Sequence, residues 1–209
     1  MTAPCNGFEK MSSKILGILG SPRKDGNTAD LLDAALLGAR SSGATTERLD
    51  LADMDLNPCK ECRACDAGAT CAFADDDDMG EIYSRIRNVD GIILASPIFF
   101  MGVSAQTKAM VDRCQCYWVE RYVLKRRAYE GKVRPKGLFV SCAGSPKPNI
   151  FEPALHVVKA FFAAIDYQYV GEVLLGHTDD PAMGPRKQAA IVSAEAAGRK
   201  LVPGSPSSE

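Results

Sequence analysis

The stretch ILGILGSPRKDGNT, residues 15–28, decides the fold of this chain. It opens with the apolar run Ile15–Leu19, which predicts a short buried strand ending at Gly20. The polar loop 20–28 follows, and apolar residues then recur on one helical face, so we expect a helix over Ala29–Arg40 with Thr28 near its N-cap. A strand, a polar loop and a helix start form an anion site, because backbone N–H groups and the helix dipole point at the same place.

The same alternation of strands and helices continues along the chain. Further strands are predicted at Thr45–Leu51, Gly91–Ala95, Gly137–Cys142 and Tyr167–Leu175. Further helices are predicted at 79–86, Gln106–Tyr117, Pro153–Ile165 and Pro185–Leu201. Five strands that alternate with helices predict an α/β domain, in which helices cover both faces of a parallel sheet.

The length of 209 residues suits one such domain, which we place at 14–202. Residues 1–13 are interpreted as a loose N-terminal extension, with Met11 as an alternative start to Met1. The Pro/Ser-rich segment 203–209 is interpreted as a flexible tail.

Composition excludes several classes of partner. The formal net charge is -1, which leaves no basic excess to neutralise nucleic-acid phosphates. No apolar run approaches the roughly 20 residues that cross a bilayer, and the N-terminus lacks the apolar core of a signal peptide. We therefore expect no nucleic-acid partner, no membrane partner and a cytoplasmic location, where thiols stay reduced.

The loop 20–28 carries donors that suit an anion. They are the hydroxyl, guanidinium and amide groups of Ser21, Arg23, Asn27 and Thr28. The loop is neither a mononucleotide P-loop, which needs Gly-Lys-Ser/Thr, nor a G-x-G-x-x-G dinucleotide loop. We expect it at the carboxyl end of the first strand, where open α/β sheets bind ligands. An ordinary turn with N-capping residues is the alternative.

Two further loops are expected at the same edge of the sheet. The loop after the third strand places apolar side chains beside a glycine, which suits a flat aromatic ligand or, alternatively, a contact with a neighbouring subunit. Its candidate residues are Pro97, Ile98, Phe99, Phe100, Met101 and Gly102. The fourth strand ends in the small residues Ala143 and Gly144, where a ligand can approach closely.

A cysteine-rich loop at 57–75 follows the second strand, which places it near this edge. Its C-x2-C-x2-C-x5-C motif consists of Cys59, Cys62, Cys65 and Cys71. Thiolates gathered so closely fit an iron–sulfur cluster, while a structural zinc and cluster-free redox thiols are the alternatives. A zinc ribbon would separate two C-x2-C knuckles by about 15–20 residues, and that separation is missing. Lys60 and Arg63 either offset the charge of an anionic cluster or extend into solvent.

Other chemically active residues receive simpler interpretations. Cys114, Cys116 and Cys142 are expected to be small buried residues, and His156 and His177 to be structural or exposed. The acidic run Asp75–Asp78 is expected to favour the positive end of the following helix dipole rather than to bind Ca²⁺.

The basic segment 120–127 is interpreted as a solvated helix face. The alternative is a surface that attracts a nicotinamide phosphate or an acidic ferredoxin.

Three stretches together resemble a known family. They are GSPRKDGNT at 20–28, SPIFFMGVSAQTKAMVDR at 96–113 and SCAGS at 141–145. The chain, over about 14–200, resembles the NADPH-dependent FMN reductase branch of the flavodoxin-like proteins, and its cysteine loop resembles that of the iron–sulfur flavoproteins. The resemblance implies a three-layer sandwich with sheet order 2-1-3-4-5 and a homodimer or homotetramer.

The resemblance also implies cofactors. The first loop would bind the FMN phosphate, and Pro97–Gly102 would line the isoalloxazine ring. A [4Fe–4S] cluster on the four cysteines would lie close to the FMN of a neighbouring subunit. The expected function is electron transfer, through FMN and the cluster, between a donor such as NAD(P)H or ferredoxin and an acceptor. A cluster-free NAD(P)H-dependent flavin or quinone reductase and a non-enzymatic electron carrier remain as alternatives.

Overall fold

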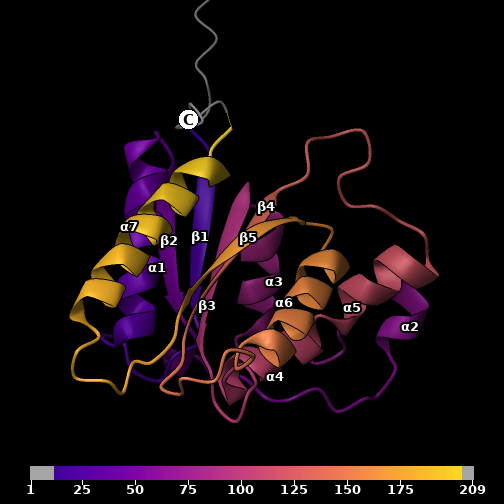
Figure 1. The fold of residues 1–209 in the computed structure, drawn as a ribbon. Coiled ribbons are helices and arrows are strands. Elements are labelled where there is room, and N and C mark those ends of the chain that lie inside the picture. The colour runs from indigo at the N-terminus through magenta and orange to yellow at the C-terminus, as the bar shows by residue number, and fades with distance from the viewer. Residues whose placement is uncertain (1–11, 204–209) are drawn as a thin grey trace, which may run out of the picture.

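The computed structural model describes residues 12–203, which form a single sheet with helices on both faces (Figure 1). The predicted extension 1–13 and tail 203–209 lie almost wholly outside the described residues, as does the choice between Met1 and Met11. The strands are β1 (Lys14–Leu19), β2 (Thr45–Asp50), β3 (Gly91–Pro97), β4 (Lys136–Cys142) and β5 (Gln168–Leu175). All pairings are parallel and the order is β2-β1-β3-β4-β5, so the predicted flavodoxin-like topology is confirmed.

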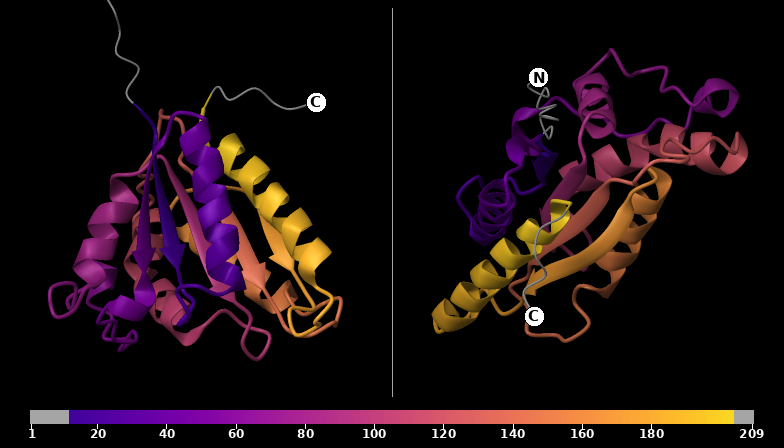
Figure 2. Two further views of the ribbon diagram at one scale, coloured as in Figure 1. Left: turned by 90° about the vertical axis from the view of Figure 1, so that its left-hand side faces the viewer. Right: turned by 90° about the horizontal axis from the view of Figure 1, so that it is seen from above.

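The helices form two layers. One face of the sheet is covered by α1 (Asn27–Ser41) and α7 (Gly184–Leu201), which lie side by side in Figure 2. The other face is covered by α3 (Met79–Arg87), α4 (Ala105–Arg113) and α6 (Glu152–Ala164) (Figure 1). Short segments complete the chain: η1 (Leu51–Asp53), α2 (Cys65–Gly68), α5 (Gln115–Trp118) and the π-helical η2 (Val119–Val123).

Two glycines let α1 and α7 pack backbone to backbone. A Cβ on Gly38 would lie 2.0 Å from the carbonyl oxygen of Glu195, and one on Gly198 would lie 1.9 Å from that of Ala35. Neither position has room for a larger residue, so α7 is held directly against the helix that starts at the first loop.

The start of α1 differs from the prediction. Gly26, with extended backbone angles, is the N-cap, and the helix begins at Asn27. Thr28 therefore lies inside the first turn, two residues after the N-cap, and the helix begins earlier than the predicted Ala29. No side chain of the described chain caps this helix start, so its first N–H groups face the loop.

The predicted helix Gln106–Tyr117 is interrupted at Cys114, which separates α4 from α5. The carbonyl of Arg113 accepts a hydrogen bond from the hydroxyl of Tyr83, with an oxygen-to-oxygen distance of 2.6 Å. The N–H of Tyr117 bonds to the carbonyl of Cys114 rather than to that of Arg113. A tertiary contact thus accompanies the interruption of a helix that the local pattern would continue.

The basic segment 120–127 is not the continuous solvated helix face that the sequence predicts. Helical structure ends at Val123, and both Arg121 and Arg127 pair with the buried carboxylate of Asp166. By contrast, the predicted burial of Cys114, Cys116 and Cys142 is confirmed.

Both histidines are exposed, as predicted. Within 12–203, no helix is long and apolar enough to cross a membrane.

Candidate functional site

Backbone hydrogen bonds bring the three predicted loops together at the carboxyl edge of the sheet. The N–H of Gly20 donates to the carbonyl of Ala95 at 2.7 Å, which joins the first loop to β3. The N–H of Ile98 donates to the carbonyl of Cys142 at 2.9 Å, which joins the second loop to the third. The structure therefore places the three loops where the sequence predicted them.

Buried hydroxyl groups fix the first loop against α4. Ser104 donates from Oγ to the carbonyl of Gly20 at 2.5 Å, and its own N–H donates to Ser96 Oγ at 2.9 Å. A Cβ on Gly20 would lie 1.8 Å from Thr107 Oγ1. Only glycine fits at this position without displacing the network.

The first loop surrounds the uncapped start of α1. Ser21 and Thr28 are buried, Asn27 is half-buried and Arg23 is exposed. The hydroxyl of Ser21 accepts a hydrogen bond from the N–H of Arg23 at 3.1 Å, which curls the loop. Hydroxyl groups, backbone N–H groups and one exposed cation thus meet at a helix N-terminus, an arrangement that can hold a phosphate.

The second loop is a tight turn that exposes aromatic surface. Phe99 and Gly102 exchange two backbone hydrogen bonds of 3.0 and 2.9 Å. Between them Phe100 and Met101 have φ angles of 48° and 67°, in the left-handed region that most side chains disfavour. The ring of Phe100 at the tip is fully exposed and that of Phe99 is half-exposed.

The third loop meets an acidic residue. Ala143 is buried, and a Cβ on Gly144 would lie 2.2 Å from the carboxylate oxygen Oδ2 of Asp179. In this structure the close neighbour of Gly144 is Asp179, a residue that the sequence did not single out, whereas the prediction concerned a ligand.

The four motif cysteines line one cavity of about 800 Å³. Cys59 and Cys62 are exposed, whereas Cys65 and Cys71 are half-buried. The opposite wall comes from the end of α4, from α5 and from η2, and includes Arg113, Cys116 and Trp118. None of the predicted ligand residues in the three loops, all of which the structure describes, lines this cavity. The cavity is therefore a second site, separate from the three loops. Figure 1 shows α2, which carries Cys65, beside α5 and away from α1 and α7.

The backbone around the cysteines is strained. Glu61, Arg63 and Ala69 all have left-handed φ angles, of 51°, 60° and 58°. Each such residue costs on the order of 1–3 kcal/mol, and strain of this kind gathers at functional sites. Among the residues 12–203, no three His, Cys, Asp or Glu side chains converge closely enough to hold a single metal ion.

The two cations within the loop are engaged locally. The ammonium of Lys60 lies 4.3 Å from the centre of the Phe73 ring, and Arg63 pairs with Asp66 at 2.9 Å.

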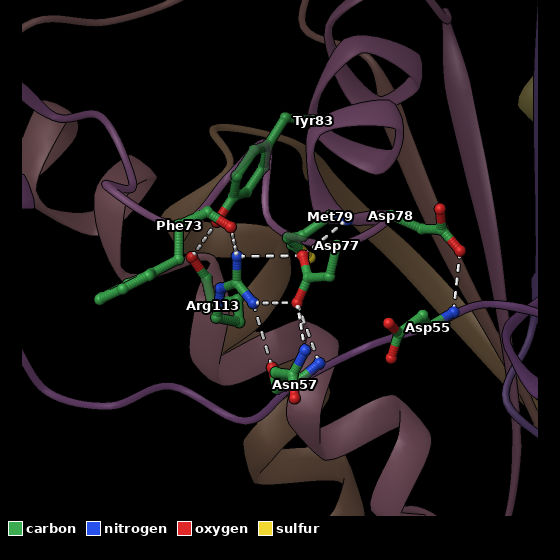
Figure 3. Close-up of polar contacts among 8 residues, drawn as sticks. All are labelled: Asp55, Asn57, Phe73, Asp77, Asp78, Met79, Tyr83 and Arg113. Carbon is green, nitrogen blue, oxygen red and sulfur yellow. Dashed lines mark hydrogen bonds and ion pairs between the residues drawn. The ribbon is translucent and has the colours of Figure 1, made fainter.

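A buried ion pair closes the cysteine loop (Figure 3). Arg113 Nη1 lies 2.6 Å from Oδ2 of Asp77, and the two side chains are 4% and 1% exposed. Arg113 also donates to the carbonyl of Asn57 at 3.1 Å and to that of Phe73 at 2.7 Å. Asp77 in turn accepts from the N–H of Asn57 at 3.0 Å. The pair therefore ties together the residues just before Cys59 and just after Cys71.

The pair determines the charge states of both groups. Burial alone would raise the pKa of Asp77, but hydrogen bonds from Arg113 and from the N–H groups of Asn57 and Met79 lower it to about 2. Burial disfavours the charged guanidinium of Arg113 and so tends to lower its pKa. Interactions with Asp77 and with the nearby Cys71 thiol outweigh this effect, so the pKa of Arg113 is raised. On the same wall, burial raises the pKa of the Cys116 thiol to about 11.

Sequence reasoning missed most of this wall. From the sequence, Asp77 is expected only to favour the helix dipole, Arg113 has no expected role, and Cys116 is expected to be a small buried residue. One signal was available: Arg113 lies at helical spacing from Met110, which places a charged residue on an apolar helix face.

Comparisons with known proteins agree with this geometry. The sequence pattern of the family "NADPH-dependent FMN reductase" matches residues 13–179. An iron-sulfur flavoprotein from Archaeoglobus fulgidus is 34% identical over 185 residues, which cover 88% of this chain and 80% of that protein. One from Methanocaldococcus jannaschii is 47% identical over 100 residues, covering 48% of this chain and 51% of the relative.

Solved structures match the fold. An NAD(P)H:quinone oxidoreductase from Methanothermobacter marburgensis superposes with a TM-score of 0.65 at 19% identity, over 91% of this chain and 97% of that chain. An FMN-dependent NADH-azoreductase from Bacillus anthracis, solved in complex with FMN, superposes with a TM-score of 0.68 at 15% identity, over 90% and 99%.

Fold and loops thus define a flavodoxin-like α/β protein with a second, cysteine-lined cavity. The chain belongs to the NADPH-dependent FMN reductase family and is close to the iron-sulfur flavoproteins. The matched region spans only about half, 51%, of the M. jannaschii relative.

Proposed function

We propose that this protein is an NAD(P)H-dependent oxidoreductase that binds FMN at the three loops and a [4Fe–4S] cluster in the cysteine cavity. It would pass electrons between NAD(P)H or ferredoxin and an acceptor. One observation carries the proposal: in a chain of the FMN reductase family, all four motif cysteines line a single cavity.

The three loops suit FMN in chemistry. Ser21, Arg23, Asn27 and Thr28 would hold the phosphate at the start of α1, where N–H groups and the helix dipole favour an anion. The turn Pro97–Gly102 would lie along the flavin ring, with Ala143 and Gly144 on the opposite side. The hydroxyl network around Gly20 would keep the phosphate loop rigid before the ligand binds.

The cysteine cavity suits a cluster better than a single ion. A structural zinc needs its sulfurs at about 2.3 Å from one point. Here the four thiols are among the residues that line one cavity of about 800 Å³, which leaves room for a larger group. An iron–sulfur cluster with four cysteine ligands is a larger object. The positive charges of Lys60, Arg63 and Arg113 would offset the anionic thiolates.

When bound, FMN would allow a hydride to be accepted and its electrons to be released one at a time, and a [4Fe–4S] cluster would carry one electron at a time. The protein would bind both and exclude water from them.

Because the two sites are separate within one chain, we propose a homodimer or homotetramer in which one subunit's FMN approaches another's cavity. Exposed apolar residues at both sites support this arrangement: Phe100 at the turn, and Trp118 and Val123 at the cavity wall.

Iron and acid-labile sulfide assays on anaerobically purified protein test the cluster. About four irons per chain are expected, as a [4Fe–4S] cluster requires. Protein that binds FMN but contains no iron would instead support the cluster-free flavin or quinone reductase.

Steady-state oxidation of NADPH, with and without added FMN, tests the enzymatic activity. Rapid FMN-dependent oxidation is expected. A protein that holds both cofactors but oxidises neither NADPH nor NADH would instead be an electron carrier, with ferredoxin as the donor to test next.

A further inference from the structure

Arg113 carries one donor that closure of the loop does not use. A guanidinium group has five N–H donors, four on the two Nη atoms and one on Nε. Nη1 bonds to Asn57 and Asp77, and Nη2 bonds to Phe73 and Asp77. Nε is buried and has no hydrogen-bond partner in the described part of the chain. A buried N–H without an acceptor is unfavourable, so this donor indicates a missing partner.

The missing partner is expected in the cysteine cavity. Arg113 and Cys71 both line it, and Cys71 lies two residues before Phe73, whose carbonyl Arg113 holds at 2.7 Å. The Cys71 sulfur is near enough to interact electrostatically with the guanidinium. A neutral thiol is a weak acceptor, whereas the anionic sulfur of a metal-bound cysteine is a much stronger one.

The other cations are less suitable. Arg63 is exposed and pairs with Asp66, and Lys60 lies over the ring of Phe73. Arg113 is 4% exposed, so a hydrogen bond from it acts where water does not screen it.

We propose that Nε–H of Arg113 donates a hydrogen bond to the Cys71 sulfur when that sulfur is a cluster ligand. Arg113 is then a positioning residue with two effects: it holds both ends of the cysteine loop and it stabilises the reduced cluster. The inference rests on the proposed function, since it requires the cluster. Hydrogen bonds to cluster sulfurs favour the more negative, reduced state and so raise the reduction potential.

Three variants, each loaded with iron and sulfide under anaerobic conditions, test the assignment. Arg113→Lys keeps the charge but removes the Nε–H donor. Asp77→Asn keeps the donor but removes a negative charge. Arg85→Lys is the matched control, because Arg85 makes ion pairs with Glu47 and Glu81 and does not line the cavity.

The readout is the midpoint potential of the cluster in a redox titration followed by electron paramagnetic resonance. Arg113→Lys is expected to shift it to a more negative value, Asp77→Asn to a more positive one, and Arg85→Lys to leave it unchanged. General loosening of the loop would move the first two variants in the same direction. That result, or an unchanged potential in Arg113→Lys, would overturn the hydrogen bond.

A measurement on the unaltered sequence covers the case in which Arg113→Lys fails to fold or to hold a cluster. Protein labelled with ¹⁵N only in arginine should show a hyperfine coupling between the reduced cluster and one arginine nitrogen. A loaded cluster without such a coupling refutes the inference while leaving the proposed function intact. Wild-type protein that takes up no iron refutes both.

Discussion

Asp77 accepts hydrogen bonds from both Nη atoms of Arg113, at 2.6 and 3.3 Å, across 36 positions of sequence (Figure 3). The two side chains join the residues before α3 to the end of α4, and both are almost completely buried. Since the same two residues hold Asn57 and Phe73, this ion pair ties together the two ends of the cysteine loop.

Removal of the carboxylate should therefore destabilise the domain strongly. We expect Asp77→Ala to lower the free energy of unfolding by about 3–5 kcal/mol, because it leaves a buried guanidinium unpaired. Urea denaturation measures this loss. The control is Asp75→Ala, an exposed acid in the same run, for which a change within about 0.5 kcal/mol is expected. Equal losses in the two variants would contradict the assignment.

The pair also predicts how stability depends on pH. The pKa of Asp77 falls from 3.8 to about 2 on folding, which corresponds to about 2 kcal/mol. A lowered pKa gives stability that is fully present above the unfolded value and is lost as the pH falls through the folded value. Wild type should thus lose this increment between about pH 4 and pH 2, and Asp77→Asn should not. Parallel stability curves for the two proteins over that range would be inconsistent with the prediction.

Gly20 should be irreplaceable. The Cβ of Gly20→Ala would lie 1.8 Å from Thr107 Oγ1, so the first loop must shift. We expect FMN affinity to fall by about tenfold or more, equivalent to about 1.4 kcal/mol, in a fluorescence titration. Gly184→Ala is the control, because a Cβ there meets no atom within 4 Å among the described residues. Unchanged FMN affinity in Gly20→Ala would exclude the loop from the flavin site.

The turn Phe99–Gly102 should contribute to binding of FMN or of a second subunit rather than to the stability of the folded chain. Replacement of Phe100 and Met101 by Asn-Gly suits two left-handed positions and should stabilise the folded chain by about 1–2 kcal/mol in urea denaturation. The same variant should bind FMN or a second subunit more weakly, which titration and sedimentation measure. Val133→Ala, at an exposed position with no assigned role, controls for lost apolar surface. A variant that is more stable and still binds FMN and a second subunit as tightly as wild type would contradict a binding role for Phe100 and Met101.

Thiol labelling should separate two groups of cysteines in the cluster-free protein. Cys59 and Cys62 are exposed and should react quickly with iodoacetamide, whereas Cys114, Cys116 and Cys142 should react only after unfolding. Burial raises the pKa of Cys116 and Cys142 to about 11, so little thiolate forms at neutral pH. Peptide mass spectrometry assigns each site. Loading with iron and sulfide should protect the motif cysteines, and fast labelling of Cys142 in the folded protein would contradict its burial.

Most of the fold was predictable because its signals are local. A parallel sheet that is buried on both faces requires continuous apolar runs in its strands, and β1 and β3 have such runs. The glycine that follows β1 is an equally local signal. The positions of the three loops followed, since parallel strands end at one edge. The break at Cys114 could not be predicted, because no local pattern shows that Tyr83 reaches the carbonyl of Arg113 from another helix.

The sequence by itself determined the α/β class, the order of elements and the four thiols in one loop, since each depends on spacing along the backbone. Only the tertiary structure decided that these thiols share a cavity with Arg113, that Asp77 neutralises that arginine, and that the cavity is separate from the three-loop edge. The physical reason is that a buried charge takes its partner from whatever elements pack around it, and that packing is settled by the whole core rather than by neighbours in sequence.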